Sequence, residues 1–231
     1  MSALLSRIIF DNDHFIVVFK QAGELSVPSR FANQDDRDVL GLQLQEHFKT
    51  QIFPVHRLDF EVSGLVLYAK NKEAHAAANG WFENKIVEKT YRALTSPQNY
   101  SHIPATISNP RLPLTLQIGQ ELTWKCKMLR GKRRAYETPA GKSCETKATY
   151  IGLDGNSSLI WDLKPVTGRG HQLRFDLSRH GFCILGDQLY GSRESYKKEA
   201  IALMAYRINF VKVKDRLRWG LPEKIEIPPQ F

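Results

Sequence analysis

The first part of the chain alternates between short hydrophobic runs and polar turns. Residues 7–10 (RIIF) and 14–20 (HFIVVFK) are β-branched and aromatic runs on either side of a DND turn, which predicts a β-hairpin. Over residues 40–48, apolar side chains recur at every fourth position with Gln and Glu between them, which predicts an amphipathic helix. Residues 64–70 (GLVLYAK) are typical of a buried strand, and Asn71 is placed to cap an alanine-rich helix.

The second half of the chain continues mainly as strands. Residues 99–113 are rich in Pro, Asn and Ser without periodicity, which predicts a surface connection. Near the carboxyl end, Leu173 and Leu177 lie one turn apart and Gly181 follows, which predicts a short helix, whereas the prolines of EIPPQF exclude further strand pairing. Further strands are predicted at 89–95, 144–151, 158–164 and 201–213. Many strands with few, non-alternating helices indicate an α+β fold with a mixed or antiparallel sheet.

The charge of the chain points to a polyanionic partner. Its composition is that of an ordinary folded protein of 231 residues, but the net charge is +9 and the pI is about 9.5. Residues 121–147 carry eight basic and three acidic residues, a local net charge of +5. We expect Lys132, Arg133 and Arg134 to contact a nucleic-acid backbone, the alternative being a solvated face. No apolar run suits a signal peptide or a membrane span, so we expect a cytoplasmic protein with no membrane partner.

The cysteines and histidines do not predict a metal centre. Cys126, Cys144 and Cys183 are odd in number and lack CxxC spacing, so reduced thiols are expected. His171 and His180 match no common ligand spacing, so no metal is expected.

Two segments carry candidate chemistry. In residues 54–70, Asp59 lies between a polar turn and a buried strand, two positions after Arg57, where a carboxylate could act as a nucleophile or could simply cap a turn. Residues 165–191 are dense in Gly, Arg and His where a helix begins. Backbone N–H groups and Arg169 would suit a phosphate there, although a capped basic surface helix would have the same composition.

Three motifs in one order give the chain a resemblance to the RluA-type family of RNA pseudouridine synthases. HRLDFEVSGLVLYAK resembles the catalytic motif of that family, EKTYRAL its tyrosine motif, and PVTGRGHQLRFDL with ILGDQLYG its arginine motif. The resemblance implies the pseudouridine-synthase catalytic fold with an RNA-binding cleft, no cofactor, and isomerisation of uridines in structured RNA. Ribosomal RNA is favoured over transfer RNA as the target.

The resemblance also implies roles for individual residues. Asp59 would be the catalytic carboxylate, Tyr91 would lie against the target base, and Arg174 would pair with Asp59. Arg57 would fill the space that the flipped nucleotide leaves. Further RNA contacts are expected from His56, Arg169, His171 and Gln172.

Some features depart from the family pattern or leave alternatives open. Val62, Gln21 and the pair Ala205-Tyr206 stand where relatives commonly have other residues. We expect one catalytic domain over residues 1–231, without an S4-like module in front, acting as a monomer without an obligate protein partner. The competing hypotheses are a non-catalytic RNA-binding or ribosome-assembly protein and a glycosylase that releases free uracil.

Overall fold

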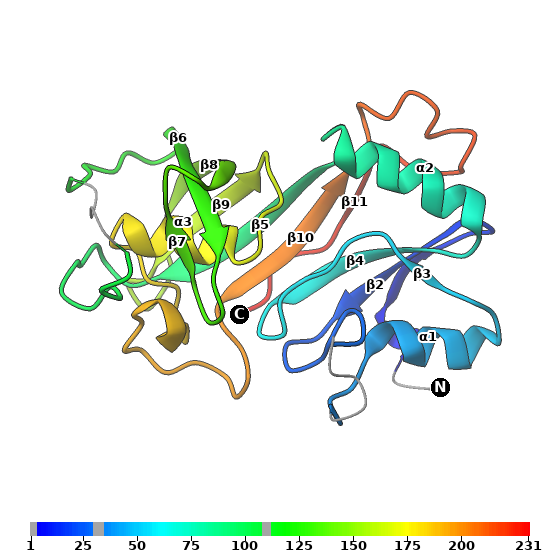
Figure 1. Cartoon of the computed structure of the whole chain (residues 1–231), viewed down its shortest axis with the longest axis horizontal. Helices are drawn as coiled ribbons and strands as arrows, with labels where there is room; N and C mark the ends of the chain where they lie inside the picture. Colours follow the sequence, from blue (N-terminus) through cyan, green and yellow to red (C-terminus); the bar gives the residue numbers. More distant parts are fainter. Residues whose placement is uncertain (1–3, 30–34, 108–111) are drawn as a thin grey trace. The chain divides into compact units, whose positions relative to one another are not determined.

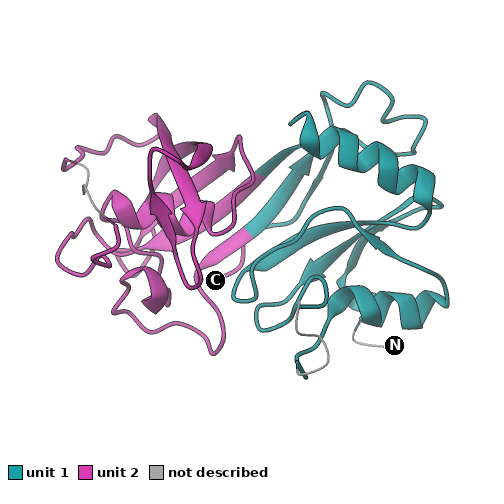
Figure 2. Cartoon of the chain, viewed as in Figure 1, with its two compact units in different colours: residues 1–89, 205–228 teal, residues 90–204, 229–231 magenta. Residues whose placement is uncertain are grey.

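A computed structural model of the chain describes residues 4–29, 35–107 and 112–231, and they form two compact units (Figure 2). Unit 1 comprises residues 1–89 and 205–228, and unit 2 comprises residues 90–204 and 229–231. Strands β5 (Glu88–Thr95) and β10 (Leu203–Asn209) each begin in one unit and end in the other. Two of the three passages of the chain between the units therefore run along a strand, and the third lies between residues 228 and 229, after β11.

Unit 1 is built on antiparallel strands. After a short 3₁₀ turn (Leu5–Arg7), β1 (Ile8–Asp11) and β2 (Phe15–Lys20) form the hairpin that the sequence predicts, and β2 pairs with β4 (Ser63–Ala69). The short strand β3 (Phe53–Pro54) pairs with β4, and β11 (Lys224–Glu226) pairs with β10. Neither short strand is expected from the sequence, because two or three residues show no periodicity.

Two helices cover the faces of this sheet, and both are predicted by the sequence (Figure 1). α2 (Lys72–Glu83) packs its alanines and Trp81 against inward side chains of β2 and β4. Asn71 caps it, accepting a hydrogen bond from the Ala74 amide at 2.9 Å. α1 (Leu40–Phe48) lies by Tyr68 of β4, which points to the opposite face from the core under α2.

Unit 2 is also built on antiparallel strands, which belong to the same sheet as those of unit 1. Its strands follow the order β5, β9, β8, β6, β7, and one helix and one 3₁₀ turn pack beside them. The bounds are β6 (Glu121–Arg130), β7 (Ala135–Glu137), β8 (Lys142–Leu153), β9 (Leu159–Pro165), α3 (Gln172–Arg179) and η3 (Gln188–Tyr190). No helix or strand occurs in residues 96–107 or 112–120, as expected for the 99–113 connection, of which 108–111 lie outside the described residues.

Helix α3 departs from the surface helix that its basic composition allowed. All eight of its residues are buried, among them Arg174, Asp176 and Arg179. It ends as expected, with Gly181 at φ +82°. A buried helix that carries charged side chains must satisfy them with internal partners, because an unpaired buried charge is costly.

The described residues contain three α-helices and eleven strands, which confirms the α+β class. None of these helices has the length and apolar character needed to cross a membrane.

Candidate active site

The predicted catalytic aspartate lies on a turn of unit 1 that is fixed by buried contacts. Residues 55–62 connect β3 with β4, and the carbonyl of Asp59 accepts a hydrogen bond from the Val62 amide at 3.1 Å. Just before Asp59, the Leu58 amide donates to Oγ of buried Ser26 at 3.1 Å. Just after it, the Phe60 carbonyl accepts from the Gly23 amide at 3.0 Å. The backbone on both sides of Asp59 is therefore held, while its carboxylate is half-buried.

A buried lysine at the end of β2 completes this support. Nζ of Lys20, which is 0% exposed, donates to the carbonyls of Gln21 at 2.7 Å, Glu24 at 2.8 Å and Phe60 at 3.2 Å. Burial lowers the pKa of Lys20 to about 8, and the nearby carboxylates of Glu24 and Asp59 oppose that shift. Lys20 therefore joins the strand hairpin to the turn that carries Asp59.

Arg57 and His56 differ sharply in their surroundings. Arg57 is exposed, as a residue that enters an RNA helix must be. His56 instead accepts a hydrogen bond from the Leu67 amide at its Nε2 atom (3.1 Å) and stacks on Phe82 with ring centroids 5.0 Å apart. Burial holds the pKa of His56 well below its usual value, so its imidazole is neutral and supports β4. Its RNA contact stays a prediction.

Tyr91 and Arg174 belong to unit 2. Tyr91 lies on β5 opposite Leu163 of β9, and its side chain is 7% exposed. Arg174, 2% exposed, forms a bidentate pair with Asp187, with Nε–Oδ2 at 2.7 Å and Nη2–Oδ1 at 2.8 Å. Its guanidinium also lies over the ring of Tyr190, 5.3 Å from the centroid. Asp187 therefore fixes the plane of the guanidinium, using two of its five donors.

The turn before α3 is organised by Gln172. Its amide group donates to the Glu145 carbonyl and to Thr146 Oγ1, both at 2.9 Å. Its carbonyl oxygen accepts from Thr167 Oγ1 at 2.8 Å and from the Arg169 amide at 3.0 Å. Gln172 is 3% exposed, so it shapes the turn from inside, and a direct contact with RNA would require the turn to open.

The other two residues predicted at this turn are more accessible. Half-buried Arg169 donates from Nε to the Ser143 carbonyl at 3.1 Å. His171 adopts the left-handed conformation (φ 59°), with Nδ1 3.1 Å from the Tyr190 hydroxyl and Nε2 3.1 Å from Nη2 of Arg130. The structure thus brings His171 beside a basic residue of β6.

Four basic residues lie where β6 ends and the chain turns into β7. We call this group the basic hairpin: Arg130, Lys132, Arg133 and Arg134. Lys132 and Arg133 are exposed at its tip. Arg134 is half-buried and donates from Nε to the Leu189 carbonyl at 2.5 Å, next to Tyr190. The predicted RNA-binding residues 132–134 therefore share unit 2 with Arg169, His171 and Arg174.

The acidic residues of the same stretch pair away from the basic hairpin. Lys125 lies 3.4 Å from Glu145, and Lys147 lies 3.1 Å from Glu121, across β6 and β8. Glu137 lies 3.6 Å from Arg179. These pairs, which the linear sequence does not reveal, leave the hairpin tip as the main concentration of positive charge in the stretch.

The site residues come from both units, Arg57 and Asp59 from unit 1 and Tyr91 and Arg174 from unit 2. The expected pair between Asp59 and Arg174 stays a prediction. The sequence reasoning missed Lys20 and Asp187. Asp187 lies within the segment ILGDQLYG, and Lys20 ends the apolar run HFIVVFK, but neither pattern indicates a buried partner.

Comparison with known proteins gives one consistent result. Residues 14–179 match the family model described as RNA pseudouridylate synthase. The dual-specificity RNA pseudouridine synthase RluA of Vibrio vulnificus is 31% identical over 210 residues, which cover 90% of this chain and 79% of that protein. The protein of the same name from Yersinia pestis is 33% identical over 193 residues, which cover 81% and 83%. The solved structure of human RNA pseudouridylate synthase domain containing 1 has a similar fold, with a TM-score of 0.66, 24% identity, and coverage of 88% of this chain and 77% of that one.

Proposed function

This chain belongs to the RNA pseudouridylate synthase family, and from that premise we propose that Asp59 is the carboxylate with which it isomerises uridines in structured RNA. The chain is an RNA pseudouridine synthase, an isomerase whose substrate is RNA. The support for Asp59 is its place in the matched region, on a turn whose backbone is held on both sides by Ser26, Gly23 and Lys20. A held turn suits a reacting carboxylate, because reactive groups must be placed accurately.

The reaction breaks the bond between N1 of uracil and the ribose, turns the base, and joins C5 to the ribose with loss of the C5 proton. Nothing is oxidised, reduced or hydrolysed, so the demands on the protein are access, position and an ionised carboxylate. A uridine inside a folded RNA must first be flipped out, at a cost of a few kcal/mol. The exposed guanidinium of Arg57 is proposed to occupy the vacated space.

Two residues of unit 2 are proposed to act with Asp59. Arg174, already oriented by Asp187, is proposed to pair with the Asp59 carboxylate and keep it ionised. Tyr91 is proposed to present its ring to the flipped uracil, where stacking contributes about 1–3 kcal/mol per base. Both proposals require that the two units meet around the flipped nucleotide.

Outside the reacting centre, the residues proposed to contact RNA directly are mainly basic side chains of unit 2. The basic hairpin and Arg169 would bind phosphates, and His171, 3.1 Å from Arg130, would join them. His56 and Gln172 hold strand β4 and the turn before α3, so their RNA contacts are proposed to be indirect.

We propose ribosomal RNA as the main target, with transfer RNA as a second. The relatives from Vibrio and Yersinia are named as dual-specificity enzymes, which supports more than one kind of RNA substrate. We also propose that the protein acts as a monomer in the cytoplasm.

The decisive experiment is to delete the gene and map the uridines of ribosomal and transfer RNA that lose pseudouridine. Wild type is expected to restore them, Asp59→Ala to restore none, and Asp13→Ala, which changes an exposed aspartate of the same unit, to restore all. In vitro, Asp59→Ala should bind the target RNA within about threefold of wild type while forming no product.

The same assay separates the competing functions. Chromatography of digested RNA would show pseudouridine for the isomerase, free uracil for a glycosylase, and neither for a non-catalytic RNA-binding protein. Full restoration by Asp59→Ala would remove Asp59 from the mechanism.

A further inference from the structure

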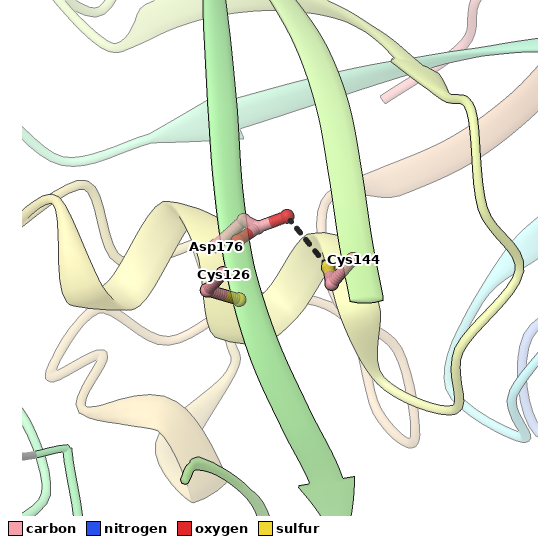
Figure 3. A group of neighbouring side chains, drawn as sticks. All are labelled: Cys126, Cys144 and Asp176. Atoms are coloured by element: carbon pink, nitrogen blue, oxygen red, sulfur yellow. Dashed lines mark hydrogen bonds between the residues drawn. The ribbon is translucent and has the colours of Figure 1, made fainter. Parts of the chain in front are cut away.

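Two cysteines that are remote in the sequence lie side by side in unit 2 (Figure 3). Cys126 on β6 and Cys144 on β8 are directly opposite one another in the antiparallel register. Both point toward α3, because Cys144 belongs to the core beneath that helix and Cys126 packs against it. Their sulfur atoms and a carboxylate oxygen of Asp176 all lie within 4.8 Å of one another.

Charged groups of α3 surround the pair. Sγ of Cys144 donates to Oδ2 of Asp176 at 3.7 Å, and Thr146 Oγ1 donates to the same oxygen at 2.6 Å. Nε of Arg179 lies 3.1 Å from Oδ1 of Asp176, and this guanidinium is buried. Figure 3 shows the carboxylate of Asp176 linked to Cys144 beside the two strands. The thiols therefore have a proton acceptor and a cation within the same cluster.

The two thiols are not equivalent. Cys126 is half-buried, whereas Cys144 is 2% exposed. The adjacent Cys144 thiol, with the positive charge of Arg179, lowers the pKa of Cys126. The neighbouring Cys126, together with burial, raises the pKa of Cys144. The accessible sulfur is thus the better nucleophile, and the buried one keeps its proton.

We propose that Cys126 and Cys144 form a peroxide-sensitive thiol pair, in which Cys126 is oxidised first and Cys144 then closes a disulfide between β6 and β8. A disulfide joins sulfurs at about 2.05 Å and suits residues with Cα atoms about 4.4–6.8 Å apart, as opposite residues of antiparallel strands are. Closure therefore calls for side-chain rotation, and the strand register stays as it is.

The chemistry balances with hydrogen peroxide as the oxidant. The Cys126 thiolate attacks one peroxide oxygen, the O–O bond breaks, and the released hydroxide takes a proton to become water, which leaves a sulfenic acid. Asp176 accepts the proton of Cys144, whose sulfur attacks the Cys126 sulfur and displaces hydroxide. That hydroxide recovers the proton from Asp176, so two thiols and one peroxide give one disulfide and two waters.

A metal site is the competing use of the same residues, and the structure favours it less. Structural zinc sites are closed by four protein ligands, whereas this group offers three among the described residues. The guanidinium of Arg179 also lies against one oxygen of Asp176, where a cation would be repelled. The pair therefore suits oxidation better than metal binding.

The test uses the full-length reduced protein and one equivalent of hydrogen peroxide. Mass spectrometry of the unreduced digest should find Cys126 joined to Cys144, with loss of two hydrogens that dithiothreitol reverses. Cys183 should stay free, because burial raises its pKa to about 11 and it lies elsewhere, with Sγ 3.3 Å from the Tyr190 carbonyl. Before oxidation, iodoacetamide should modify Cys126 at least about tenfold faster than Cys183.

Variants then separate the two roles. Cys144→Ser should leave Cys126 as a sulfenic acid that dimedone traps, and Cys183→Ser should form the disulfide as wild type does. If a variant fails to fold, the wild-type digest still decides. Oxidation of Cys183 first, disulfides between molecules only, or a tightly bound stoichiometric zinc ion that protects both thiols would each overturn the proposal.

Discussion

The residues that support the proposed site carry charged groups that are buried away from solvent. Lys20, Arg174 and Asp187 are all buried, and each is satisfied by internal partners. Burial of charge is costly, and it is tolerated where hydrogen bonds and opposite charge offset the lost hydration. Here the benefit is position, because Lys20 holds the turn of Asp59 and Asp187 orients Arg174.

Removing the charge of Asp187 is expected to destabilise unit 2 and impair catalysis. Asp187→Asn removes the carboxylate that binds the buried Arg174 guanidinium at two points, which should lower the free energy of unfolding by about 3–5 kcal/mol. Misplacement of Arg174 should lower kcat by on the order of tenfold or more. Urea unfolding and single-turnover pseudouridine formation measure the two effects.

The matched control is Asp162→Asn. Asp162 forms an equally bidentate pair with Arg92, at 2.8 and 2.9 Å, but that pair is only partly buried on β9 and β5. Its loss should cost about 1 kcal/mol or less. If both variants lost the same free energy of unfolding, burial would not determine how much the Arg174–Asp187 pair stabilises the fold.

The depressed pKa of Lys20 predicts a pH-dependent stability. A lysine whose folded pKa is about 8, against an ordinary 10.5, contributes stability that is complete above pH 10.5 and is lost as the pH falls through 8. The free energy of unfolding of wild type, measured relative to that of Lys20→Met, should therefore rise by about 3 kcal/mol between pH 7 and pH 10.5.

Urea titrations of both proteins across this pH range measure that difference, in which the titrations of all other groups cancel. Lys214→Met, which changes an exposed lysine of the same unit, gives the baseline for loss of one lysine. Parallel curves for wild type and Lys20→Met would contradict the depressed pKa.

At the scale of elements, the sequence predicted most of the fold because most elements carry their own periodicity. The helix over 40–48 was predicted with the bounds of α1, and the hairpin of β1 and β2 followed from two apolar runs around a turn. β6 is not among the predicted strands, because the apolar residues that alternate along it stand between Lys and Glu residues, and the sequence of this segment indicates charge more plainly than a strand. Periodicity is local, so it identifies strands better than it identifies their partners.

For the site, the sequence predicts the residues that lie in contiguous motifs and does not predict their buried partners. The motifs around Asp59, Tyr91 and Arg174 are contiguous in the sequence, so a resemblance could find them. The partners of buried groups are properties of the folded chain: Asp187 faces Arg174, and Cys144 faces Cys126 across two strands. No spacing rule in the sequence indicates such contacts.

The basic hairpin yields a prediction at the scale of one element. Lys132→Ala with Arg133→Ala should weaken binding to every RNA similarly and flatten the dependence of log K on log salt by about 1.5, because each lost phosphate contact removes about 0.7–0.9 from the slope. Filter binding at several salt concentrations measures the slope.

Lys125→Ala with Lys147→Ala removes the same charge from residues that pair with Glu145 and Glu121, and it should change the slope much less. If both double variants behave alike, net charge rather than the hairpin governs RNA binding. If neither changes the slope, the hairpin is a solvated tip.

At the scale of the whole molecule, we expect residues 1–231 to unfold as one cooperative domain, and the reason is the connectivity of the two units. The chain passes between the two units along β5 and β10, and each strand begins in one unit and ends in the other. Loss of either unit would leave part of these strands without neighbours. Elements that depend on one another in this way are expected to unfold in a single cooperative transition.

A glycine of unit 1 provides the test of this cooperativity. Gly64, at φ +124°, lies so close to the backbone of Ala205 that an added Cβ would stand 2.5 Å from the Ala205 nitrogen. Gly64→Ala should therefore strain β4 against β10 and lower the stability of unit 1 by several kcal/mol, on the order of other core overpacking changes. Gly155→Ala, at an open turn of unit 2, is the control.

Hydrogen exchange measured by mass spectrometry along a urea titration follows the peptides of each unit separately. For one cooperative domain, Gly64→Ala should lower the unfolding midpoint of peptides from β8 and β9 of unit 2 as much as that of peptides from β2 of unit 1. If only unit 1 shifts, the units fold independently, and a site that draws Asp59 from one and Arg174 from the other could then be assembled by the RNA itself rather than by folding alone.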